Sequence, residues 1–186
     1  NCTGKFDHDG VLIMSGGLLN IGGDYKSSSS ATESIDGGTI EVVGDWDGSS
    51  NGAFTPTGGI VVLNGTSNNN LTINSSSNFY DLTIDNSTGE VDVTADLNVA
   101  GDLIINSNST LDIGNANANL NIGGDFSNSG TFISSGETLT FNGTGVNTCS
   151  PIVDASMDII INKSSNGSIT FLGNCSFDEF TLSDGK

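Results

Sequence analysis

One short motif recurs along the chain, and its spacing limits the possible folds more than any other feature. The motif is a hydrophobic alternation followed by Gly, Asp and an apolar residue, and it occurs four times, at Leu19–Tyr25, Ile40–Trp46, Leu97–Leu103 and Leu120–Phe126. Within each neighbouring pair of copies the motif returns after about 21 to 23 residues. A period of this length, filled with short strands and Gly, Asn and Ser turns, is typical of a solenoid in which each period forms one coil.

A longer repeat lies over the short one. Ile40–Gly65 aligns with Leu120–Gly143, and Asp81–Asp85 aligns with Asp158–Asn162, with nearly the same displacement along the chain. We therefore predict an internal duplication of about 78 residues, each copy spanning three to four coils. The expected organisation is a single domain over residues 1–186, with an N-terminal loop at 1–10, a first block of coils at 11–105 and a second block at 106–186.

The composition favours strands over helices. The chain has 26 glycines, is rich in Asn and Ser, and has only 14% charged residues, so long helices are not expected. Alternation along each strand predicts that Leu120 and Ile122 face inward and Asn121 outward. The sequence thus predicts an all-β, right-handed parallel β-helix of roughly eight coils. Its core should hold columns of stacked side chains, Tyr25 near Trp46, and its exterior ladders of Asn, Ser and Thr.

The charge balance excludes one large class of partner. Twenty-two acidic residues face four lysines and no arginine, which gives a net charge of −18. Nucleic acid is excluded because the cations needed to neutralise phosphates are missing, and anionic membranes are disfavoured for the same reason. No apolar run reaches the roughly 20 residues needed to span a bilayer. The start at Asn1 leads us to expect a mature or excised piece of an exported protein.

Three segments also resemble a known group of proteins. They are Phe141–Gly145, Met157–Ser165 and Leu120–Phe132. They are similar to the β-helical repeats of large secreted surface proteins of the Bacteroidetes type, many of them adhesin-like cargo of the type IX secretion pathway, and the resemblance covers residues from about 15 to 183. It implies an exported, surface-attached or matrix role and carries over no catalytic residues. No type IX sorting domain is visible in the sequence.

The repeated aspartates are the sharpest candidate for ion binding. Residues one coil apart stack at about 5 Å, so Asp24 should lie near Asp45, and Asp102 near Asp125. Calcium bound by these four carboxylates would offset the repulsion. The alternative, which we favour, is an Asx-turn in which each carboxylate accepts backbone N–H bonds at the corner and needs no ion.

Cysteine spacing and glycosylation motifs suggest covalent modifications. We predict a disulfide between Cys149 and Cys175, whose separation along the chain is near one coil, and leave the partner of Cys2 open. Asn-x-Ser/Thr motifs are compatible with glycosylation, although an Asn-rich chain also produces them by chance. They begin at Asn1, Asn64, Asn70, Asn74, Asn86, Asn108, Asn142, Asn162, Asn166 and Asn174.

The chain offers little for catalysis, so we do not expect an enzyme. A polysaccharide-degrading β-helix needs clustered carboxylates, and the candidate pairs are Asp45 with Asp47 and Asp178 with Glu179. Neighbouring residues in a strand, such as Asp178 and Glu179, point in opposite directions, and acidic residues are commonplace in turns. The single histidine, His8, is interpreted as part of a solvated terminal loop.

The sequence therefore favours an extracellular structural or adhesive unit of a surface fibre or matrix. Val11–Met14 and Phe177–Leu182 provide uncapped apolar strands near the two ends, which predicts head-to-tail self-association. The alternative is a carbohydrate-binding module for surface glycans, which would expose aromatic rings, whereas a structural unit would bury Tyr25, Trp46, Phe126 and Phe132.

Overall fold

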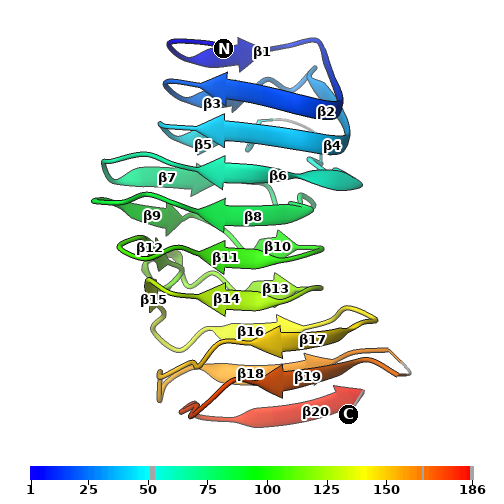
Figure 1. Ribbon diagram of the computed structural model, residues 1–186, viewed down its shortest axis with the longest axis vertical. Coiled ribbons are helices and arrows are strands. Elements are labelled where there is room, and N and C mark those ends of the chain that lie inside the picture. Colours follow the sequence, from blue (N-terminus) through cyan, green and yellow to red (C-terminus); the bar gives the residue numbers. More distant parts are fainter. Residues whose placement is uncertain (51–52, 165, 185–186) are drawn as a thin grey trace.

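The computed structural model, which describes residues 1–50, 53–164 and 166–184, is a parallel β-helix. The coils stack from the N-terminus at one end of the rod to the C-terminus at the other (Figure 1). Strands on the near side run to the left and strands on the far side run to the right while the chain descends, so the helix is right-handed, as predicted (Figure 1). Neighbouring strands pair in parallel, as a solenoid requires.

Three sheets form the sides of the rod. Sheet A has one strand from each of eight coils, in agreement with the expected number. In chain order its strands are β2 (Val11–Ile21), β4 (Thr32–Val42), β6 (Gly58–Leu63), β8 (Asp81–Ile84), β11 (Leu103–Ile105), β14 (Phe126–Asn128), β17 (Val146–Cys149) and β19 (Ser168–Phe171).

Sheets B and C complete the coils. Sheet B contains β1 (Phe6–His8), β3 (Tyr25–Ser27), β5 (Trp46–Asp47), β7 (Asn69–Thr72), β9 (Glu90–Val93), β12 (Thr110–Asp112) and β15 (Thr131–Ile133). Sheet C contains β10 (Leu97–Val99), β13 (Leu120–Ile122), β16 (Thr138–Phe141), β18 (Asp158–Asn162) and β20 (Phe180–Asp184). The helical content of the described residues is one 3-10 turn, η1 (Gly114–Ala116), between β12 and β13.

Glycine pairs bend the long strands of the first coils. Gly17, Gly38 and Gly59 all have positive φ values, of 81°, 89° and 84°. They recur once per coil and stack on one corner, where β2 and β4 change direction. A side chain is strained in this conformation, so the corner requires glycine in each of these coils.

The core consists of columns of like side chains, as the alternation predicted. Leu97, Leu120, Leu139 and Ile159 follow one another in register on sheet C. The rings of Tyr25 and Trp46 stack with 3.9 Å between centroids. On the exterior, Asn121 donates to Asn98 across neighbouring coils at 2.9 Å, which confirms a ladder of asparagines at this position.

The two copies of the duplication do not occupy the same sheets. Asp81–Ile84 forms β8 in sheet A, whereas its counterpart forms β18 in sheet C. Similarly, β9 lies in sheet B and its counterpart β19 lies in sheet A. The chain passes through the sheets in the order A, B, C, and the offset between the copies is one side short of four coils, so each strand of the second copy lies one sheet earlier in this order than its counterpart. The boundary at 105/106 lies within a coil, between β11 and β12.

One prediction about the N-terminus is wrong. Residues 1–10 were expected to form a loop, yet β1 pairs in parallel with β3, and Cys2 forms a β-bridge with Ile21. Phe6 and His8 of β1 lie in register with Tyr25 and Ser27 of β3, so this segment is the first strand of sheet B. The short pattern Phe-Asp-His alternates like the other strands, but so short a segment does not let periodicity distinguish a strand from a loop.

The aromatic column gives a test of the packing. Trp46 is 1% exposed and contacts Tyr25, Phe54 and Phe79. Trp46→Ala should lower the free energy of unfolding by about 3 to 5 kcal/mol, because a large ring is removed from a packed core. Urea denaturation measures this loss. Tyr80→Ala, at a ring that is 39% exposed, is the matched control and should change stability much less; equal losses for both variants would contradict the packing described.

Candidate functional site

The repeated aspartates hold neighbouring coils together through the backbone. Asp24 Oδ1 accepts the N–H of Asp45 at 3.0 Å, and Asp102 Oδ1 accepts the N–H of Asp125 at 2.7 Å. Asp45 and Asp125 in turn accept an N–H from the coil that follows them. Each carboxylate therefore bonds to the next coil. The expected Asx-turn, in which the carboxylate bonds to its own corner, is wrong, because the N–H donors belong to the next coil. The expectation that backbone N–H groups are the donors is confirmed.

The glycine before each aspartate has a steric purpose that the sequence alone did not reveal. A Cβ at Gly44 would lie 2.1 Å from Asp24 Oδ1, and a Cβ at Gly124 would lie 2.2 Å from Asp102 Oδ1. Gly101 is in the same position against Asp81, a further member of the series that the motif search did not include. In these three Gly-Asp pairs the glycine makes room for the carboxylate of the preceding coil, whereas a Cβ at Gly23, before Asp24, would meet the backbone of Gly4 and Lys5.

The calcium site considered as the less favoured possibility at these aspartates is not assembled by the described residues. Asp24, Asp45, Asp102 and Asp125 contribute to backbone bonds at successive corners and do not form a group of three ligands. Carboxylates come together instead at Glu90, Asp92 and Asp112, whose nearest oxygens all lie within 4.8 Å of one another.

This acidic group lies on the outer side of sheet B, on β9 and β12. Asp92 and Asp112 are stacked in register, and Glu90 is two residues before Asp92 on the same face. Asn115, beside η1, donates to Asp92 at 2.8 Å and to Asp112 at 2.9 Å. Burial raises the pKa of Glu90, and the charge and hydrogen bond of Asp92 raise it further. Sequence reasoning missed this group because it depends on the register between two coils.

A second polar group lies in the interior at the N-terminal end. His8 Nε2 is 3.1 Å from both Tyr25 Oη and Glu33 Oε1, and the Tyr25 hydroxyl donates to the same carboxylate oxygen at 2.8 Å. The side chain of Glu33 is 2% exposed and that of His8 is 11% exposed. Burial, followed by the charge of Glu33, raises the pKa of Tyr25 well above its usual range. The interpretation of His8 as part of a solvated loop is therefore wrong.

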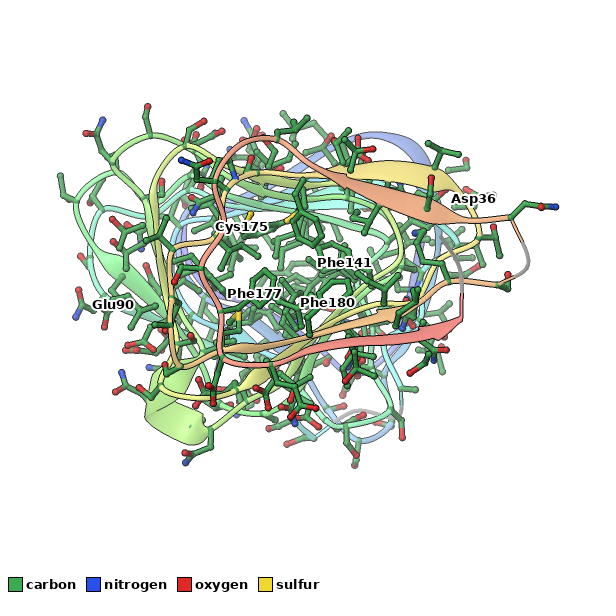
Figure 2. The ribbon with its side chains drawn as sticks, turned by 90° about the horizontal axis from the view of Figure 1, so that it is seen from below. Asp36, Glu90, Phe141, Cys175, Phe177 and Phe180 are labelled. Carbon is green, nitrogen blue, oxygen red and sulfur yellow. The ribbon has the colours of Figure 1, made fainter. Side chains whose placement is uncertain are left out.

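The cysteines are free thiols in the structure. Cys149 is buried and pairs in register with Phe171 of the next coil, not with Cys175. Burial raises the pKa of Cys149 to about 12, and the nearby Cys175 makes a smaller contribution in the same direction. Figure 2 shows Cys175 at a corner of the last coil. A disulfide between the two stays a prediction for oxidising conditions.

The asparagines of the glycosylation motifs differ in accessibility. Asn86 is fully buried, donates to the Ser67 carbonyl and to Asn69 Oδ1, and has no room for a glycan. Glycosylation at Asn86 is therefore not supported. Asn64 and Asn74 are partly buried. The remaining candidates are exposed, and their glycosylation stays a prediction: Asn1, Asn70, Asn108, Asn142, Asn162, Asn166 and Asn174.

Neither the carboxylate pairs nor the pocket forms a clear substrate site. Asp45 accepts the Asn70 N–H, whereas Asp47 pairs with Lys26 at 3.1 Å, so the two carboxylates have separate partners. Asp178 and Glu179 are both exposed on the last coil. A pocket lined by Pro56, Tyr80, Asp81 and neighbouring aliphatic residues has a volume of about 10 Å³, room for about one water molecule.

Comparisons of the chain with protein-family models, curated proteins and solved structures found no significant match. Among the described residues, no helix is both long enough and apolar enough to cross a membrane.

The acidic group on sheet B makes a prediction about stability and pH. The pKa of Glu90 is raised in the folded state, so its carboxyl favours folding below its unfolded pKa of about 4.3, and this contribution is lost as pH rises through the raised pKa. Glu90→Gln should therefore raise the Tm at pH 7 by about 1 to 4 °C, because it removes one charge from a group of like charges on β9 and the adjacent β12. The gain should disappear near pH 4.

Thermal unfolding monitored by circular dichroism, in buffer containing a chelator, measures this effect. Glu179→Gln is the matched control, because it removes one negative charge from an exposed position on the last coil. A Glu90→Gln variant that melts below the wild type at pH 7 would show that the carboxylate stabilises the fold, contrary to the repulsion inferred here.

Proposed function

We propose that the protein is an extracellular, non-enzymatic structural or adhesive module that forms part of a surface fibre or matrix. The observation that carries the proposal is the open apolar interior at the last coil. Phe177 and Phe180 lie across the end of the rod, over the interior that also contains Phe141 (Figure 2). Phe180 is 47% exposed and Leu182 is 55% exposed.

The apolar end fits a further coil. Phe180 continues the column of Leu139 and Ile159 on sheet C, and its ring contacts those of Phe171 and Phe177. A coil placed on top would bury these rings and pair with the free backbone groups of β20. In the assembly we envisage, that coil is the first coil of a second copy.

The opposite end has matching features. Sheet A ends there in β2, whose Leu12 and Met14 are only partly buried against the core. Because every coil runs in the same sense, the edge of β2 in one copy can pair in parallel with the edge of β19 in another. This head-to-tail contact does not close into a ring, so it propagates as a filament.

An extracellular location fits the surface chemistry. The exterior carries ladders such as Asn98 with Asn121, and the chain has a net charge of −18. Such a surface remains soluble and repels other copies sideways. Contacts along the axis, where the apolar residues lie, are thereby favoured over lateral aggregation. The resemblance to secreted surface β-helices points in the same direction.

A carbohydrate-binding role is the second candidate, and Tyr80 is the observation in its favour. This ring is 39% exposed beside Pro56 and Asp81. However, Tyr25, Trp46 and Phe126 are buried and Phe132 is partly buried, as expected for a structural unit. A hollow of about 10 Å³ is also too small for a sugar ring.

The proposal predicts concentration-dependent end-to-end association. Light scattering should show particle mass rising with protein concentration, and rising further with salt because the like charges are then screened. Electron microscopy should show the particles as linear. Phe180→Asp, which places a charge in the proposed contact, should raise the dissociation constant by at least about tenfold.

Ile104→Asp is the matched control, since Ile104 is an exposed apolar residue in the middle of sheet A, far from either end. This variant should associate like the wild type. A strictly monomeric wild type at all concentrations and salt levels would contradict self-association, and equal association by the Phe180→Asp variant would move the contact elsewhere.

A further inference from the structure

Lys163 is an unusual member of the core. It is 0% exposed and ranks among the largest fully buried side chains, although it follows β18 in a polar turn. Two glycines make room for it and its partner. A Cβ at Gly167 would lie 2.9 Å from Lys163 Cβ, and a Cβ at Gly145 would lie 3.2 Å from Asn147 Oδ1. The local sequence thus provides a cavity for a lysine.

The lysine amine is the first atom of a chain of contacts across three coils. Lys163 Nζ donates to Asn147 Oδ1 at 2.8 Å, and Asn147 Nδ2 donates to Asp125 Oδ1 at 3.0 Å. The same Asp125 oxygen accepts the backbone N–H of Thr148 at 2.9 Å. The amine, the carboxamide and the carboxylate are therefore joined in a chain of hydrogen bonds.

The first copy of the duplication shows what a purely structural residue looks like in this place. At the offset between the copies, Asn86 is the counterpart of Lys163, and Asn69 is the counterpart of Asn147. Asn86 Nδ2 donates to Asn69 Oδ1 at 3.0 Å and is itself fully buried. A neutral amide thus meets the structural requirement. An amine in the second copy costs desolvation without a structural need.

The protonation states suit a reaction between the amine and the amide. Burial lowers the pKa of Lys163, although the charge of Asp125 opposes this effect. The Thr148 N–H bond is the main cause that lowers the pKa of Asp125, with a further contribution from Asn147. Asp125 therefore remains a carboxylate that can accept a proton, while the neutral, nucleophilic form of the lysine is made more accessible.

We propose that Lys163 and Asn147 form an intramolecular isopeptide bond, with Asp125 as the proton carrier. The neutral Nζ attacks Asn147 Cγ, so the Nζ–Cγ bond forms and the Cγ–Nδ2 bond breaks. Asp125 takes one proton from the attacking nitrogen and delivers it to Nδ2, which leaves as ammonia. The products are a secondary amide and ammonia, and no oxidant, reductant or cofactor takes part.

The bond would join two adjacent coils covalently. Asn147 lies in β17, and Lys163 lies in the turn between β18 and β19, which is the strand paired with β17. The link is thus close to the C-terminal end, where the proposed filament contact transmits force. The modification goes beyond the proposed function and does not depend on it, because it takes place within one chain.

Mass spectrometry of the folded protein tests the bond. The intact mass should fall below the sequence mass by one ammonia. A lysine-specific protease should fail to cut after Lys163, because its nitrogen is acylated, and should yield residues 27–186 as one fragment. Succinimides at asparagines that precede glycine, such as Asn142 and Asn166, also lose ammonia. Hydroxylamine cleaves succinimides and leaves an isopeptide intact, so the digest is repeated after this treatment.

Two variants separate the reaction from the fold. Lys163→Asn restores the arrangement of the first copy and should fold with its full mass. Asp125→Asn keeps an oxygen for the Thr148 N–H but loses the proton carrier, so it should fold, retain the ammonia and be cut after Lys163. Wild-type protein that keeps its full mass and is cut after Lys163, following prolonged incubation in the folded state, would overturn the proposal, as would a full-speed reaction in the Asp125→Asn variant.

Discussion

Backbone hydrogen bonding between coils is the interaction on which the rest of the structure depends. Each strand pairs in parallel with its counterpart one coil later, so a paired residue is held about 4.8 Å from the residue at the same register. This spacing makes similar residues neighbours whether or not their contact is favourable. For Leu97 and Leu120 the result is a packed column. At Asp24 and Asp45 the same stacking places the Asp24 carboxylate beside the backbone N–H of Asp45, from which it accepts a hydrogen bond.

The arrangement of the repeated residues could be predicted from the sequence, whereas contacts that depend on the register between coils could not. The four Gly-Asp motifs were enough to predict a parallel β-helix of about eight coils and the stacking of Tyr25 on Trp46. The same motifs did not reveal that the glycine accommodates the carboxylate of the preceding coil, because that contact lies between periods. The acidic group around Glu90 was missed for this reason. The internal alignment likewise revealed the duplication but not that the second copy occupies different sheets from the first.

Comparison of the two copies helps to distinguish residues that the fold requires from residues that have a further chemical role. Because both copies use the same local contacts on different sides of the rod, a difference between them is not imposed by the side of the helix. Asn86 and Lys163 are such a difference: both are buried and both donate to an asparagine Oδ1. At the N-terminal end, the buried Tyr25 hydroxyl and Glu33 carboxylate are hydrogen-bonded to one another. The apolar rings of Phe177 and Phe180 lie over the core at the C-terminal end and are not fully covered.

Native-state hydrogen exchange followed by mass spectrometry or NMR is the most direct measurement of the stacked-coil account. Interior coils are paired on both sides, whereas the first and last coils are paired on one. The account predicts that amide protection is highest in the strands of the middle coils, such as β8 and β11, and falls progressively toward β1 and β20. Strong protection confined to one sequence block, or weak protection of the middle strands relative to the ends, would contradict it.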